Sequence, residues 1–273
     1  MKIPHQSDRA AQRHAAAGST PATTPLTEVR KIGAVIYLSS NRPLRLPDFL
    51  SEFHENWPSS SLEKTGKEPH RAFFRAGRSA FSLELHHTQV PHAITEPVRD
   101  STLHWPTAAK DLSHHVAYIE IVASPGNAGL LTLATDLTRA AASLAAVTDS
   151  LAICWLNGPA LNQAKAFIST AREMFATGLY PLTLWTAVRF DSKSRTLATH
   201  GMEQFEAPEI VLANQPDAAP LMVEYVFQVA LSELGSRHPV REGDQLNGPH
   251  GSLKVKSGTW DDGRRVLILE PSR

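Results

Sequence analysis

The stretch IGAVIYLSSNRPLRLPDFLSEFHENWP, residues 32–58, contains the pattern that decides the fold class. Its first seven residues, 32–38, are mostly apolar and rich in β-branched types, which is typical of a buried strand. Asn41 and Pro43 end this strand, and large apolar residues then recur at helical spacing over residues 46–57. A buried strand followed at once by an amphipathic helix indicates helices layered on a sheet.

The rest of the chain alternates between strands and helices in the same way. The further strands that we predict are residues 70–77, 79–91, 114–124, 150–156, 180–190 and 208–214, with a final hairpin over 252–270 that turns near Asp262 and Gly263. The further helices are residues 128–148, 160–177 and 218–234, with a weak helix or irregular stretch over 93–111. This irregular alternation predicts a layered α+β fold, and its first half fits a ferredoxin-like split βαβ unit.

Two short segments of similar sequence, an internal echo, bear on the domain organisation. AVIYLSSNRP (34–43) and AICWLNGP (152–159) each join a strand to an amphipathic helix through an Asn-x-Pro turn. The echo indicates two α+β halves of ferredoxin-like type, residues 32–125 and 126–273, although two matches this short also arise by chance. Residues 1–31, rich in Ala, Thr, Ser and Pro, are expected to be a disordered tail.

Charge and composition exclude several classes of partner. Lys and Arg together number 27, as do Asp and Glu, so no net field favours nucleic acid or an anionic membrane. The apolar stretch around residues 129–156 is interrupted by charges too often for a membrane span. A single cysteine, Cys154, rules out an intrachain disulfide framework and suits the cytoplasm. We therefore expect a soluble cytoplasmic protein without nucleic-acid or membrane partners.

Signatures of catalysis are weak. The chain lacks a dinucleotide fingerprint, a phosphate-binding loop and a nucleophile elbow, and Cys154 lies inside an apolar strand. Glu84 and His86 lie on one predicted strand. If that strand pairs with the one that begins near residue 114, His86 faces His114 or His115, and with Glu84 nearby these residues form a potential zinc site. Solvated strand-end histidines are the favoured interpretation, so no metal and no cofactor are expected.

The segment THGMEQFEAPEI, residues 199–210, contains a histidine, a glycine and three glutamates between two apolar stretches. Gly201 adopts a positive φ at low cost and therefore predicts a turn, while Glu209 is placed to accept the N–H groups of that turn. The alternative is a catalytic pair in which Glu209 orients His200 as a general base. The structural role is favoured, so no catalytic residue is assigned. The residues of this structural or binding motif are Thr199, His200, Gly201, Met202 and Glu209.

A resemblance to a known family supports this part of the chain. LATHGMEQFEAPEIVL, LAICWL, LTLWTAVRF and REGDQLNGPHGSLKVKSG are similar to the bacterial family called domain of unknown function 4261, best over residues 150–273. The matching positions are Trp155, Trp185, Thr199, Gly201, Met202, Phe205, Pro208, Glu209, Gly243, Asp244 and Gly248. Glu206 and Gln245 depart from the family's usual glycine and threonine. The resemblance implies a related fold, adds Asp244 to the motif residues and carries no settled activity.

These observations favour a non-enzymatic bacterial protein-binding module. Its concrete form, suggested by family analogy, is an immunity or adaptor protein that neutralises a secreted toxin by direct binding. One alternative is a metal-assisted hydrolase that uses Glu84, His86 and His114, or His200 with Glu209. The other is a small-molecule sensor domain, which requires a large apolar pocket between the halves.

Overall fold

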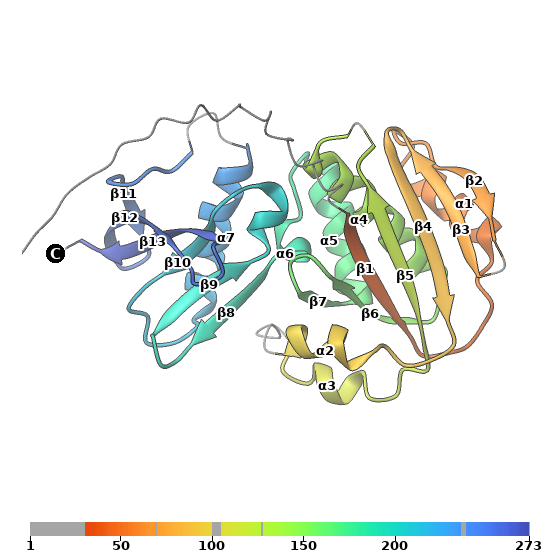
Figure 1. The fold of residues 1–273 in the computed structure, drawn as a ribbon, viewed down its shortest axis with the longest axis horizontal. Coiled ribbons are helices and arrows are strands. Elements are labelled where there is room, and N and C mark those ends of the chain that lie inside the picture. The colour runs from red at the N-terminus through yellow and green to blue at the C-terminus, as the bar shows by residue number, and fades with distance from the viewer. Residues whose placement is uncertain (1–30, 69, 100–104, 127, 236–238, 273) are drawn as a thin grey trace, which may run out of the picture.

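The chain folds into two β-sheets with helices packed against them, as described by a computed structural model (Figure 1). The described residues are 31–68, 70–99, 105–126, 128–235 and 239–272. This is the layered α+β fold that the sequence predicts. The predicted tail lies outside the described residues, apart from Lys31. Within the described part of the chain, no helix combines the length and the apolar character that crossing a membrane requires.

The first sheet has seven strands. In spatial order they are β2 (Glu63–Lys67), β3 (Arg71–Ala76), β4 (Ser79–His86), β5 (Ala117–Ser124), β1 (Ile32–Leu38), β6 (Ser150–Trp155) and β7 (Ala160–Gln163). Every neighbouring pair is antiparallel, so β5 and β6 run parallel on either side of β1, as β1 and β4 do on either side of β5. The β5–β6 pair is joined through α4, and the β1–β4 pair through α1 followed by β2 and β3. This makes two interlocked split βαβ units and thus a ferredoxin-like core.

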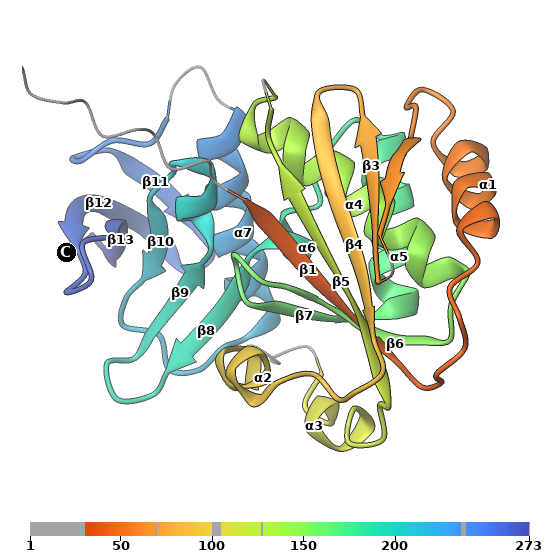
Figure 2. The same cartoon turned by 45° about the vertical axis from the view of Figure 1, so that its right-hand side comes forward.

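Helices cover the two faces of the first sheet unequally. The helices α1 (Leu46–Asn56), α4 (Leu130–Ala146) and α5 (Ala164–Ala176) lie on one side, as Figure 2 shows. The short helices α2 (His92–Arg99) and α3 (Ala108–Asp111) cover part of the other side. The alternation of β1 reflects this arrangement, because Ile36 belongs to the large core of the first side whereas Val35 and Tyr37 pack with α2 and α3.

The second sheet has six strands and a different topology. In spatial order they are β11 (Gln245–Gly248), β12 (Gly251–Thr259), β13 (Arg265–Pro271), β10 (Glu209–Leu212), β9 (Thr196–His200) and β8 (Ala187–Asp191). The parallel strands β10 and β13 are direct neighbours, so no strand splits them. Helix α7 (Pro220–Gly235) packs on β9 and β10. The ferredoxin-like arrangement is therefore found in the first sheet.

The sheets divide the chain at a different place from the predicted halves, 32–125 and 126–273. The predicted boundary falls within the β5–α4–β6 connection, and the second split unit needs both α4 and β6. The change of sheet occurs between Gln163 and Ala187. The two echoing sequences are neighbours in one sheet, since β1 pairs directly with β6. The two similar segments thus belong to one sheet.

Two local predictions are corrected by the structure. The strand predicted over 180–190 begins instead with a helical turn, α6 (Leu182–Trp185), which buries the Trp185 ring among other aromatic side chains. The helix predicted from Pro159 starts only at Ala164, because residues 160–163 form β7 and pair with β6. Both differences arise from tertiary packing that local spacing does not encode.

Candidate functional site

The predicted turn between β9 and β10 is the most densely hydrogen-bonded polar cluster that we find, and we call it the corner. It consists of Thr199, Gly201, Met202, Gln204 and Glu209, with the one-turn helix η1 (Met202–Phe205) between the strands. Gly201 has a φ of 121°, a backbone conformation that favours glycine. The structure therefore brings together Thr199, Gly201, Met202 and Glu209, four of the five predicted motif residues of this segment.

Glu209 holds the corner together. Its side chain is fully buried, and Oε2 accepts a hydrogen bond from the hydroxyl of Thr199 at 2.6 Å. Oε1 accepts from the backbone N–H groups of Gly201 at 2.7 Å and Met202 at 3.0 Å, while Nη1 of Arg264 lies 3.8 Å away. Burial raises the pKa of Glu209, and these hydrogen bonds and the guanidinium oppose that shift. Both carboxylate oxygens are thus committed to the turn.

His200 does not form a catalytic pair with this carboxylate. Its imidazole stacks on Trp260 at a centroid distance of 5.2 Å, and the guanidinium of Arg264 lies 4.5 Å above the same indole. Burial lowers the pKa of His200 to about 4, with the charges of Arg189 and Arg264 adding to the effect. Since the Glu209 oxygens accept from Thr199, Gly201 and Met202, the geometry is that of a structural anchor.

The corner also fastens the second sheet to the first. Gln204 accepts a hydrogen bond from Nε1 of Trp155, at the end of β6, at 2.8 Å. It donates to the backbone oxygens of Trp185 at 3.0 Å and Gly201 at 2.6 Å. A Cβ on Gly158 would lie 1.8 Å from the Trp185 oxygen, so the β6–β7 turn and the end of α6 approach too closely there for any side chain. Gln204 and Gly158 were missed in the sequence, because their roles depend on this contact.

Asp244 lies in a separate turn. Its Oδ2 accepts from the backbone N–H of Arg241 at 2.8 Å, and its own backbone oxygen accepts from Val255 at 2.9 Å. It therefore stabilises the start of the β11–β12 hairpin, while the hydrogen bonds of the corner involve other residues.

The alternative metal set is dispersed. Glu84 and His86 lie side by side on β4, where His86 Nε2 is 3.9 Å from Glu84 Oε1 and 3.8 Å from Glu120 Oε2, but His114 lies in the exposed turn after α3. Among the described residues, no group of three or more His, Cys, Asp or Glu side chains could hold a metal ion. Arg71 donates to Glu84 at 2.6 Å, and this hydrogen bond lowers the pKa of Glu84.

The surroundings of His115 and Cys154 indicate that both residues have structural roles. The Nε2 atom of His115 accepts from the backbone N–H of Val90 at 2.8 Å, and its Nδ1 contacts the Leu112 oxygen at 2.6 Å, so the ring is held from both sides. Cys154 is buried, and burial raises the pKa of its thiol to about 12. A thiol in that state is a poor nucleophile.

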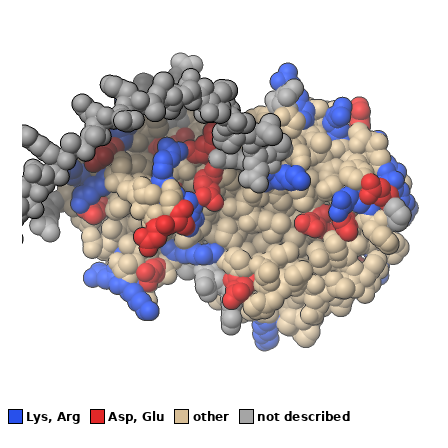
Figure 3. Space-filling model, viewed as in Figure 1, with Lys and Arg blue, Asp and Glu red and all other residues tan. Residues whose placement is uncertain are grey.

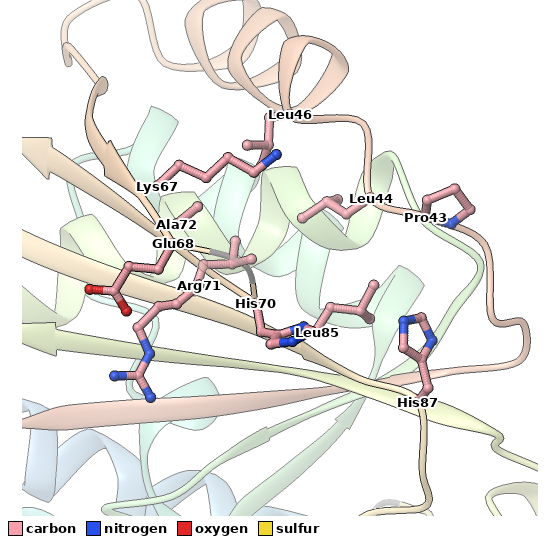
Figure 4. A pocket seen from close by; sticks show the side chains of 11 residues that line it. Pro43, Leu44, Leu46, Lys67, Glu68, His70, Arg71, Ala72, Leu85 and His87 are labelled. Carbon is pink, nitrogen blue, oxygen red and sulfur yellow. The ribbon is translucent and has the colours of Figure 1, made fainter.

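Several hollows open on the first sheet, and two of them lie beside α1 and under α2 and α3. Figure 4 shows the smaller one, of about 230 Å³, in which Leu44 and Leu85 lie between α1 and the strand ends while Arg71 extends away from them. The larger, of about 540 Å³, lies under α2 and α3 and is lined by Tyr37 and His115 among others.

Comparisons with known proteins give no match, whether to protein-family models, to curated proteins or to solved structures. The function must therefore be argued from this chain alone.

Proposed function

We propose that the chain is a non-enzymatic protein-binding module that uses the side of strands β3, β4 and β5 that faces away from α1 and α4. We call this surface the open face. Its residues are Arg71, Phe73, Arg75, Ser82, Glu84, His86, Glu120 and Val122. The observation that carries the proposal is the alternation of these strands, in which most residues facing α1 and α4 are buried and most of those on the opposite side are partly exposed.

The composition of the open face suits a protein partner. Phe73 and Val122 give it apolar contact area, while the Arg71–Glu84 ion pair and Arg75 supply polar groups around them. Aromatic and arginine side chains are enriched at protein interfaces. Figure 3, which views the molecule from this side, shows Lys, Arg, Asp and Glu scattered rather than gathered in one patch. Such a surface favours a protein over a nucleic acid, which needs concentrated positive charge.

The side chains that could carry out catalysis are engaged in structural contacts, which also supports a non-enzymatic role. Glu209 is held by three donors, His200 is stacked on Trp260, and the Cys154 thiol is buried. By analogy with the domain of unknown function 4261 family, the concrete form that we propose is a cytoplasmic immunity or adaptor protein. It would neutralise a secreted toxin by covering the toxin's surface with an interface of standard size.

Co-expression with the product of the neighbouring gene, followed by size-exclusion chromatography, tests the proposal. We expect a one-to-one complex that Phe73→Glu abolishes, because a carboxylate would then be buried at the centre of the interface. Lys193→Glu, in the exposed β8–β9 loop of the second sheet, is the matched control and should leave the complex intact. A folded Phe73→Glu variant that still co-elutes would exclude the open face. The failure of any neighbouring product to co-elute with the wild-type protein would remove the immunity form.

A further inference from the structure

The cavity under α2 and α3 has a buried floor and an exposed rim. The floor includes Tyr37, Val98, Ala108 and Leu112, each no more than 8% exposed. The rim includes His92, Glu96 and Ser113, which are exposed. At about 540 Å³ the cavity is within the size range of small-molecule sites.

The floor contains one polar group without a hydrogen-bond partner among the described residues, the hydroxyl of Tyr37. Its side chain is 1% exposed, and its hydroxyl makes no hydrogen bond with any residue that the structure describes. Buried hydroxyl groups in native proteins are nearly always paired, so an unpaired one requires an explanation. Burial raises the pKa of Tyr37, which keeps the phenol protonated and able to donate.

The neighbouring polar groups on the floor are already engaged. The ring of His115 packs edge-on against Tyr37 at a centroid distance of 5.0 Å, and its two nitrogens contact the backbone of Val90 and Leu112. Above the floor, the Thr95 hydroxyl donates to the His92 oxygen within α2, and His92 pairs with Glu96 at 3.8 Å. Tyr37 is thus the buried residue of the cavity lining whose hydroxyl has no partner among the described residues.

We infer that this cavity binds an uncharged small molecule with an apolar ring or chain and one carbonyl oxygen, which accepts a hydrogen bond from Tyr37. An ionised ligand would lose its hydration against Val98, Ala108 and Leu112, so the floor selects against charge. A pure hydrocarbon would leave the Tyr37 hydroxyl unpaired, so the floor selects for one acceptor. This site is separate from the open face and does not depend on the proposed protein partner.

Two probes of similar shape test the inference: acetophenone, which has the carbonyl, and ethylbenzene, which lacks it. Their affinities are measured by titration of ¹³C-labelled leucine methyl groups, with shifts expected at Leu112 and Leu161, both of which line the cavity. We expect the wild-type protein to prefer acetophenone by about fivefold to tenfold, the value of one hydrogen bond. Equal affinities, or no shift with either probe, would overturn the inference.

Three variants assign the effect to the cavity. Tyr37→Phe removes only the hydroxyl and should abolish the preference, whereas Tyr118→Phe, on the same side of the sheet but outside the cavity lining, should preserve it. Ala109→Trp places an indole at the exposed rim and should block both probes without disturbing the floor. Preserved preference in Tyr37→Phe, or undiminished binding in Ala109→Trp, would show that acetophenone binds elsewhere and would overturn the inference.

Discussion

The corner at Glu209 and the cavity beside Tyr37 differ in whether their buried polar groups have hydrogen-bond partners. The Glu209 carboxylate has Thr199, Gly201 and Met202 as donors, and no side chain fits at the closest backbone approach nearby. The Tyr37 hydroxyl has no partner among the described residues, and Tyr37 is one of the residues that line a space of about 540 Å³. Complete pairing with tight packing indicates scaffold, whereas an unpaired group beside a space indicates a place for a ligand.

The largest effect is expected where the corner meets the first sheet. Gly158→Ala would place a Cβ 1.8 Å from the Trp185 oxygen, which forces the β6–β7 turn away from α6. We expect a loss of more than about 4 kcal/mol in the free energy of unfolding, measured by urea denaturation. Gly235→Ala, at the end of α7 with open space around it, is the control and should change stability little. A Gly158→Ala protein with wild-type stability would show that the junction is not tightly packed.

Removal of the central carboxylate should have the next largest effect. Glu209→Ala leaves the backbone N–H groups of Gly201 and Met202 without their acceptor, at a cost of about 3 kcal/mol. Glu224→Ala, on the exposed side of α7, should stay within about 0.5 kcal/mol of the wild type. If instead Glu209→Ala folded with unchanged stability while partner binding or any turnover was lost, the corner would be a functional site.

A smaller effect is expected in the pH dependence of stability. Since the folded pKa of His200 is about 4, below its ordinary 6.5, the folded chain binds fewer protons than the unfolded chain between these values. The free energy of unfolding should therefore decrease as pH falls from about 6.5 to about 4. Glu209 acts in the opposite direction because its pKa is raised, so its contribution is lost as pH rises.

The difference between the wild type and His200→Gln isolates the histidine, because Glu209 is common to both proteins. We expect the wild type to lose about 1–2 kcal/mol more than the variant across this range, a value reduced for the partial exposure of His200. Parallel stability curves, followed by denaturation at a series of pH values, would show that His200 is solvated rather than stacked on Trp260.

Local sequence patterns predicted the elements that local physics determines. The apolar run of β1, the helical spacing of α1 and the glycine turn at Gly201 were all recognisable, as was the acceptor role of Glu209 in that turn. These features depend on residues within about ten positions of one another, where periodicity and turn chemistry are informative.

Features built from distant segments could not be predicted. The pairing of β6 with β1 placed the sheet boundary later than residue 125, and the contact of Gly158 with Trp185 has no local signature. The cavity beside Tyr37 depends on where α2 and α3 lie, and weak helical spacing did not reveal that. The cytoplasmic location, the toxin partner and the family resemblance remain predictions.

The contrast between scaffold and ligand site is tested most directly by removing one hydroxyl from each region and measuring the free energy of unfolding. Thr199→Val deletes a hydroxyl that donates to Glu209 and accepts from the N–H of Ile210, and it should cost about 1–3 kcal/mol. Tyr37→Phe deletes an unpaired hydroxyl and should leave stability unchanged or raise it by up to about 1 kcal/mol. Equal losses in the two variants, or a larger loss in Tyr37→Phe, would contradict the account.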